Sequence, residues 1–251
     1  NNKAILYDTG ASYPSGFNMA DAVITPYLAS QGMNVLEKVL ISHGDNDHAG
    51  ALTSLGKKIR IKQLISNDKS VISQFKALPD IGNADGKINA SYQPCIKDQR
   101  FTWEGLHFEV LWPEAFDENR KQTNDDSCVV LISSGNQKVL LTGDISVKVE
   151  EKLIKRMPNL HANVLIIPHH GSKTSSGERF IKQVSPEIAL VSAGFLNRWK
   201  MPVASVIQHY QQENIPIVNT ADVGQITIDF TRQGTYLTTY KDNLRPFWFV
   251  K

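Results

Sequence analysis

The chain has 251 residues, of which 41% are apolar and 21% are charged. This composition is typical of a folded globular protein and excludes an intrinsically disordered chain. The net charge of +2 does not by itself require an anionic partner. No apolar run reaches the ~18–20 residues that a membrane-spanning helix needs. We therefore expect a soluble domain whose contacts with any nucleic acid depend on local groups.

Short β-branched runs that end in polar or Gly-rich loops recur along the chain and predict strands. The predicted strands are Ala4–Tyr7 and residues 38–42, 60–65, 129–133, 138–142, 163–167, 188–192 and 226–230. Apolar residues at Val149, Leu153, Ile154 and Met157 follow helical spacing and predict an amphipathic helix.

Gly-containing turns between strand patterns predict hairpins in the middle and at the end of the chain. They span residues 101–111, 129–142 and 226–240. Strands with helices therefore precede and follow a hairpin-rich stretch, and this order favours a two-sheet sandwich covered by helices on both outer faces. We expect one domain over residues 1–251, with residues 78–94 as its one plausible insertion.

The most informative segment is Ser42-His43-Gly44-Asp45-Asn46-Asp47-His48, which follows an apolar strand. So many histidines and carboxylates in one loop repel one another and are costly to desolvate unless a cation compensates them. Alternate side chains of an extended loop point the same way, which would direct His43, Asp45 and Asp47 to one centre and His48 to a second. The alternative is a solvated turn that contains these residues by chance.

Two later strands also end in residues of the ligand type. Asp144 follows residues 139–143, and its two oxygens suit a bridge between two metal ions. The pair His169 and His170 follows residues 164–168, and we expect at least one of them to bind metal. Asp144 could instead cap a helix, and either histidine could be structural. Taken together, the three strand ends favour a binuclear metal site.

These motifs resemble the metallo-β-lactamase superfamily and, within it, the C-terminal domain of ComEC-type competence proteins. The likeness extends over nearly the whole chain. It includes residues 7–10, 42–50, 124–130, 141–144, 169–172, 192–194, 197–198 and 245–248, together with Cys95 before Trp103.

The resemblance implies an α/β, αββα metallo-β-lactamase sandwich, with two mixed sheets and helices on both outer faces. It also implies a hydrolase that holds two divalent metal ions. The metal ligands that it implies are His43, Asp45, Asp47, His48, Asp144 and His169. We expect Asp47 and Asp144 to be the catalytic residues, with Asp47 placed to orient a water molecule or accept its proton. Asp8, Asn124 and His170 would act as supporting or weak ligands.

Two departures from the superfamily pattern affect the metal site. Asp45 replaces a histidine with an oxygen donor, which favours Mn²⁺ over Zn²⁺ at a site that either ion could occupy. The middle histidine of the superfamily is also missing, and residues 123–126 stand around its place. A third departure is Met201, where relatives often carry a histidine. A thioether cannot donate a proton to a substrate, so we expect reduced activity.

The same resemblance implies a nuclease that degrades the non-transforming DNA strand during uptake in natural competence. The partners would be DNA, in its single-stranded form, and the rest of a membrane channel protein. This chain would then be a fragment of a bacterial cytoplasmic membrane protein, on the extracytoplasmic side. In that setting a disulfide between Cys95 and Cys128 is favoured over two buried thiols.

Residues suited to phosphate are Ser172, Lys173, Thr174, Asn197 and Arg198. Each could equally be a solvated surface residue. Trp199 could stack on a base, although tryptophans more often pack, and the basic run 57–62 is more readily a solvated face. Two other functions stay open, namely hydrolysis of a lactam, lactone or thioester, and DNA binding without catalysis.

Overall fold

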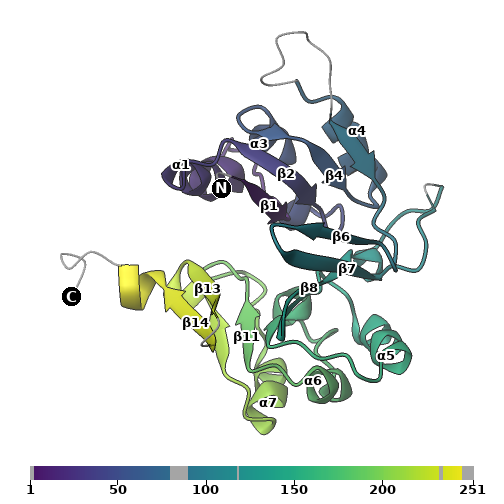
Figure 1. Cartoon of the computed structure of the whole chain (residues 1–251). Helices are drawn as coiled ribbons and strands as arrows, with labels where there is room; N and C mark the ends of the chain where they lie inside the picture. The colour runs from purple at the N-terminus through teal and green to yellow at the C-terminus, as the bar shows by residue number, and fades with distance from the viewer. Residues whose placement is uncertain (1–2, 80–89, 118, 232–233, 245–251) are drawn as a thin grey trace. The chain divides into compact units, whose positions relative to one another are not determined.

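The computed structural model describes residues 3–79, 90–117, 119–231 and 234–244, in two compact units (Figure 1). Unit one contains residues 1–99 and 110–129, and unit two contains residues 100–109 and 130–251. The larger sheets belong to an α/β fold, as predicted from the sequence. The prediction of one domain over residues 1–251 stays a prediction.

Unit one is built on a five-stranded sheet in the order β1-β2-β4-β5, with β3 also paired to β2. The strands are β1 Ala4–Tyr7, β2 Val35–Leu40, β3 Arg60–Ile61, β4 Gln63–Ile65 and β5 Ser91–Gln93. Every pairing described in this sheet is parallel. The helical segments are η1 Ala20–Ile24, α1 Thr25–Ser30, α2 Asn46–Ala49, α3 Leu52–Gly56, α4 Lys69–Lys76 and η2 Asn124–Asp126.

The core of unit one forms because the apolar residues of β2 and β4 meet the apolar faces of α3 and α4. Leu36, Val39 and Leu64 from the strands are fully buried in one cluster with Leu55 and Phe75 from the helices. α4 begins sharply because the side chain of its N-cap residue accepts hydrogen bonds from the first free backbone amides. This buried cluster packs the sheet against α3 and α4.

Unit two contains most of a seven-stranded sheet in the order β12-β11-β10-β9-β8-β7-β6. Its strands are β6 Arg100–Trp103, β7 Leu106–Trp112, β8 Val129–Ser134, β9 Gln137–Leu141, β10 Val164–Ile166, β11 Ile188–Val191 and β12 Ile217–Asn219. Strands β9 to β12 pair in parallel, whereas β6 with β7 and β8 with β9 form antiparallel hairpins.

In unit two, helix α6 packs against α5 on one side and against α7 on the other (Figure 1). Helical segments of this unit are α5 Val147–Arg156, η3 Pro168–Gly171, α6 Glu178–Val184, α7 Ala204–Gln212, α8 Thr220–Val223 and η4 Tyr240–Leu244. A separate hairpin pairs β13 Ile226–Thr231 with β14 Gly234–Thr239.

The predicted strands and hairpins occur in the structure, with shifted ends. The strand expected at residues 38–42 begins earlier and ends at Leu40. Beyond it, the backbone turns into the loop from His43 to His48, which we call the histidine loop. The strand expected at residues 60–65 is divided into β3 and β4.

Of the expected insertion 78–94, residues 80–89 lie outside the described part of the chain. Residues 245–248, which belong to the resemblance, also lie outside it. Within the described ranges, no helix combines the length and apolarity needed to cross a bilayer.

A disulfide joins Cys95, which follows β5, to Cys128, which precedes β8, at a sequence separation of 33 residues. Both cysteines are fully buried. The backbone amide of Cys128 donates to the Ser42 carbonyl at 2.9 Å, and the Tyr7 hydroxyl donates to the Cys128 carbonyl at 2.6 Å. The disulfide is therefore connected to the ends of both β1 and β2.

Replacing both cysteines, Cys95→Ala with Cys128→Ala, is expected to lower the free energy of unfolding by about 3–4 kcal/mol, because the unfolded chain regains the entropy of an open loop. Urea unfolding of wild type and the double variant under oxidising conditions measures this. In reducing buffer the two proteins should differ much less. An unchanged difference after reduction would show that lost packing, and not the cross-link, causes the effect.

Candidate metal centre

The histidine loop of unit one starts where two parallel strands end side by side. Asp8 follows β1, and Ser42 follows the end of β2 by two residues. The Asp8 carboxylate accepts hydrogen bonds from the backbone amide of Ser42 at 2.7 Å and from its hydroxyl at 2.9 Å. The C-terminal ends of parallel strands lie at one edge of a sheet, so residues 34 positions apart meet there.

Both imidazoles of this loop are buried and are held by their Nδ1 atoms. His48 Nδ1 lies 2.8 Å from the Asp8 carboxylate, and His43 Nδ1 lies 3.1 Å from the Ser42 hydroxyl and 3.4 Å from that of Ser127. The two rings are 4.2 Å apart between centroids. When Nδ1–H donates to an oxygen, Nε2 keeps its lone pair, which is the state in which histidine binds a metal ion.

Two carboxylates stand beside these Nε2 atoms. Asp45 Oδ2 lies 3.6 Å from Nε2 of His43, and Asp47 Oδ2 lies 3.9 Å from Nε2 of His48. Their side chains are 64% and 57% exposed, whereas those of the histidines are almost fully buried. We call His43, Asp45, Asp47, His48 and their support Asp8 the unit-one cluster. Its donors are imidazole nitrogens and carboxylate oxygens, which suit a divalent cation.

Gly44 lies in this loop because a side chain would not fit. A Cβ built there would collide with the carboxylate of Asp68, whose Oδ1 caps α4 by accepting from the amides of Ser70 and Val71 at 2.8 and 3.0 Å. The loop between the two histidines therefore packs directly on the start of a helix, and its backbone path is fixed.

The turn around residues 123–126 is held by an ion pair between Arg120 and Asp126. Burial alone would raise the pKa of Asp126, but hydrogen bonds from Arg120 and Thr123 hold that pKa below its ordinary value. Asp126 is thus engaged within the turn. The turn also carries Ser127, whose hydroxyl donates to the Asn124 carbonyl at 2.7 Å and lies beside His43.

A second cluster occupies the matching edge of the sheet in unit two. Asp144 follows β9 and is buried, and His169 and His170 follow β10. Nε2 of His169 lies 3.6 Å from one oxygen of Asp144, and Nε2 of His170 lies 3.7 Å from the other. We call these three residues the unit-two cluster. The sequence left His170 as a supporting residue, but its position relative to Asp144 matches that of His169.

The histidines of this cluster are also held by Nδ1. His170 Nδ1 lies 2.7 Å from the Ser192 carbonyl at the end of β11, and His169 Nδ1 lies 3.2 Å from the Thr174 hydroxyl. Both histidines have left-handed backbone angles, with φ of 51° and 53°. Each such residue costs roughly 1–3 kcal/mol and persists only where the surrounding structure enforces it. Strain of this kind is concentrated at functional sites.

Glu150, which the sequence analysis did not identify, supports the loop that follows these histidines. It is fully buried on α5, and its two oxygens accept from the backbone amides of Ser176 at 2.6 Å and Gly177 at 2.8 Å. Burial raises the pKa of the neighbouring Tyr210, so this residue keeps its hydroxyl proton. In the sequence, Glu150 lies three residues before Leu153 and therefore on the apolar face of the predicted helix. A carboxylate on that face is the sequence feature that could have identified this residue.

The residues predicted to contact phosphate have different environments. Lys173 and Arg198 are exposed. Ser172 is buried, and its hydroxyl lies 3.1 Å from that of Thr174, which in turn contacts His169. The side chain of Asn197 bonds to the backbone of its own loop. Two of the five predicted side chains are thus exposed cations, and the others support local structure.

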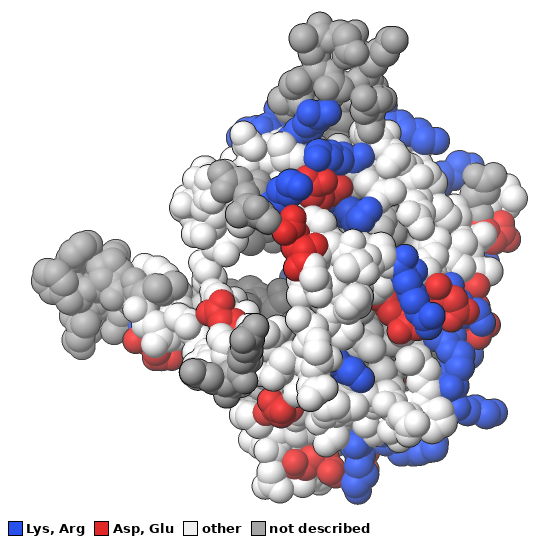
Figure 2. All heavy atoms as spheres, in the orientation of Figure 1, with Lys and Arg blue, Asp and Glu red and all other residues white. Residues whose placement is uncertain are grey.

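Two lysines of the basic run 57–62 are paired with acidic residues of unit one. Lys58 lies 2.8 Å from Asp21, whose pKa is lowered by this hydrogen bond, and Lys62 lies 2.8 Å from Glu37. Figure 2 shows blue and red side chains interspersed over the visible face. This favours the interpretation of the run as a solvated, paired face.

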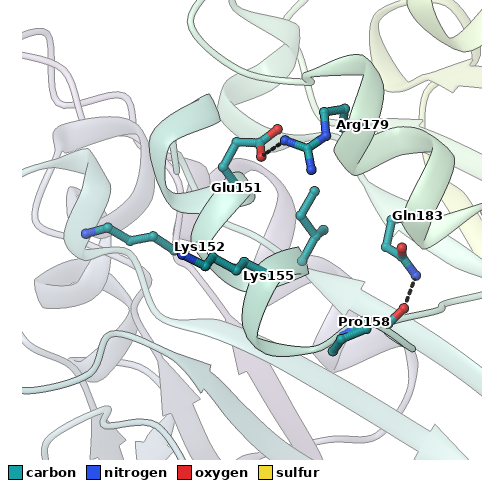
Figure 3. A pocket seen from close by; sticks show the side chains of 7 residues that line it. Glu151, Lys152, Lys155, Pro158, Arg179 and Gln183 are labelled. Atoms are coloured by element: carbon teal, nitrogen blue, oxygen red, sulfur yellow. Dashed lines mark hydrogen bonds and ion pairs between the residues drawn. The ribbon is translucent and has the colours of Figure 1, made fainter.

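A cavity of about 460 Å³ lies between α5 and α6 in unit two (Figure 3). Its lining is Glu151, Lys152, Ile154, Lys155, Pro158, Arg179 and Gln183. Arg179 is paired with Glu151 at 2.6 Å across the rim. The lining contains no histidine and no residue of the unit-two cluster, so we assign the cavity no part in catalysis.

Comparison with known proteins agrees with the resemblance drawn from the sequence. Residues 1–194 match the family model of the metallo-beta-lactamase superfamily. The chain is 34% identical over its full length to Recombination protein 2 of Haemophilus influenzae, of which it covers 29%. It is 33% identical to ComE operon protein 3 of Bacillus subtilis, with coverage of 92% of this chain and 31% of that protein. The chain thus spans less than a third of these relatives.

Among solved structures, the metallo-beta-lactamase fold protein YhfI of Bacillus subtilis matches with a TM-score of 0.53 at 17% identity. The match covers 86% of this chain and 83% of that one. At this identity the similarity concerns the fold alone. Together with the family match, it confirms the metallo-β-lactamase fold expected from the sequence.

The ion pair in the turn 123–126 generates a prediction about pH. Because the pKa of Asp126 is lowered in the folded state, its ionised form stabilises the protein above the ordinary carboxyl pKa, and this contribution is lost as pH falls through the lowered pKa. Asp126→Asn should therefore cost about 1–3 kcal/mol near pH 7, and this cost should fall progressively as the pH is lowered below the ordinary carboxyl pKa. Urea unfolding at several pH values measures the difference. The exposed Asp98→Asn is the control, and a penalty independent of pH would contradict the account.

Proposed function

Because the chain belongs to the metallo-β-lactamase superfamily, we propose that it is a metal-dependent phosphodiesterase that cleaves DNA during uptake in natural competence. The observation that carries the proposal is the state of the four histidines. In each unit, Nδ1 of both imidazoles lies at hydrogen-bonding distance from an oxygen, and Nε2 lies within 4 Å of a carboxylate. This arrangement prepares histidines to bind metal.

The two clusters are proposed to act as one site for two divalent cations. His43, Asp45, Asp47 and His48 would supply the ligands of unit one, and Asp144 and His169 those of unit two. The position of His170 beside Asp144 supports adding it to the ligands. Bound cations would supply an activated water and would neutralise charge on the phosphate. The carboxylates make the donor set rich in oxygen, which favours Mn²⁺ over Zn²⁺.

The chain's own groups have separate tasks in this proposal. Asp8 orients His48, and the Ser192 carbonyl orients His170, so neither ring has to reorganise during the reaction. Asp47, with its half-exposed carboxylate, accepts the proton of the attacking water. The exposed cations Lys173 and Arg198 bind phosphate oxygens of the substrate.

DNA as the substrate is supported by the names of two relatives, Recombination protein 2 of Haemophilus influenzae and Competence protein ComA of Neisseria gonorrhoeae. We infer that the chain acts on single-stranded DNA together with the remainder of a membrane channel protein. We place it on the extracytoplasmic side of the bacterial cytoplasmic membrane. The buried disulfide supports this location, because disulfides persist in oxidising compartments.

Cleavage of DNA is the direct test. With a panel of Mn²⁺, Zn²⁺ and Mg²⁺, wild type should cleave single-stranded oligonucleotides fastest with Mn²⁺. Asp144→Asn should be slower by roughly a hundredfold or more, because losing a ligand exceeds the loss from outer-sphere changes. The exposed Asp229→Asn in the same unit is the control. Equal cleavage by all three proteins would show that a contaminant cleaves the DNA and would contradict the proposal. Hydrolysis of a lactam or thioester with DNA left intact would show that DNA is not the substrate.

The orienting role of Asp8 gives a second prediction. Asp8→Asn keeps the shape of the side chain but removes the charge that faces His48 Nδ1, so the affinity for Mn²⁺ should fall roughly 10–100-fold. Equilibrium dialysis followed by elemental analysis measures the affinity. Asp21→Asn, an exposed carboxylate of unit one paired with Lys58, should leave it unchanged. If both variants bind Mn²⁺ with the same affinity, Asp8 does not orient His48 for metal binding.

A further inference from the structure

The loop of residues 194–201 in unit two presents large apolar side chains to solvent. Phe195 is 76% exposed, Leu196 85% and Trp199 63%. Isolated exposed apolar residues are common, but three within five positions form a patch of the kind that marks an interaction surface. None of these residues takes part in the metal centre, so the exposure needs another explanation.

The shape of this loop is fixed before any partner binds. The side-chain amide of Asn197 donates to the carbonyl of Met201 at 2.8 Å and to that of Gly194 at 3.2 Å. Its carbonyl oxygen accepts from the backbone amide of Met201 at 2.9 Å. One side chain thus closes the loop from within. A preformed surface avoids the entropic cost of ordering on binding.

Both ends of the loop are attached beside the unit-two cluster. Just before it, the Ser192 carbonyl contacts His170 Nδ1 at 2.7 Å. Just after it, the amide of Val203 donates to the Gly171 carbonyl at 3.0 Å. Pro202 packs so closely on Gly171 that a Cβ there would lie 2.5 Å from the Pro202 Cβ. A ligand on the loop is therefore held next to the histidines of its own unit.

The chemistry of the exposed surface indicates the ligand. The guanidinium of Arg198 lies 4.4 Å from the centroid of the Trp199 ring, and Lys200 is also exposed. Aromatic rings interleaved with cations bind single-stranded nucleic acids, in which bases stack on the rings and cations contact phosphates. A loop that inserts into lipid would instead keep cations away from its apolar tip, because charges in the bilayer are costly. The stacked guanidinium favours nucleic acid.

We propose that residues 194–201 form a platform on which unpaired bases of a single-stranded nucleic acid stack, with Trp199 and Phe195 as the stacking rings. The platform would make the site select single strands, since bases in a duplex are already stacked and do not expose their faces. This inference deepens the proposed function and rests on it for the role of the bound strand, but base binding itself requires no metal ion.

The experiment measures binding in the presence of EDTA, so that cleavage plays no part. Fluorescence anisotropy compares a labelled 15-nucleotide oligothymidylate with an abasic oligonucleotide of the same length, which keeps the phosphates and lacks the bases. Wild type should bind oligothymidylate roughly tenfold or more tightly than the abasic strand. Trp199→Ala should lose most of this preference while its affinity for the abasic strand is unchanged, and Phe195→Ala should reduce it.

Matched variants keep the test specific. Trp199→Phe retains a ring and should retain most of the preference, and Tyr236→Ala removes another exposed aromatic of unit two and should have no effect. Equal binding of both oligonucleotides by wild type would overturn the platform. A second result would also overturn the platform. If Trp199→Ala keeps the preference for bases but no longer binds phosphatidylglycerol vesicles, the loop is a membrane contact. If base preference is present but no DNA is cleaved, the proposed function fails and the platform stands.

Discussion

The hydrogen bond at Nδ1 of each histidine is the constraint on which the candidate centre depends. An imidazole can present Nε2 to a cation only if its other nitrogen carries the proton and the ring is prevented from turning. Here the acceptors differ, since His48 faces a carboxylate and His170 faces a backbone carbonyl. What they share is their place at the C-terminal ends of parallel strands, where the fold brings distant residues together.

Each unit reaches this arrangement in its own way. In unit one, Asp8 and Ser42 connect two strand ends and position His48, and a glycine without room for a side chain fixes the intervening loop. In unit two, two successive histidines adopt left-handed backbone conformations, and the buried Glu150 fastens the loop that follows them. In unit two, the strained backbone of these histidines persists because the surrounding packed structure enforces it, and this strain lowers the stability of the fold.

Much of this could be predicted from the sequence, because local patterns carry it. The strand ends, the loop from His43 to His48, and Asp144 were visible as apolar runs that stop at ligand-type side chains. The acceptor of His170 was not visible, because a main-chain carbonyl has no sequence signature. The alignment of His170 with Asp144 depends on two left-handed residues, a conformation that histidine seldom adopts. Asn197 was predicted as a substrate contact for its side-chain type, whereas the fold uses it to close its own loop.

The proposal with the most direct test is that the residues of the two clusters hold two divalent metal ions. Electron paramagnetic resonance of the Mn²⁺-loaded chain tests it, because two Mn²⁺ ions held close together would be exchange-coupled and would give a spectrum distinct from that of isolated ions. The account predicts two Mn²⁺ per chain with a coupled signal, and loss of the coupling in Asp144→Asn. Binding of isolated Mn²⁺ only, or an unchanged spectrum in that variant, would contradict it.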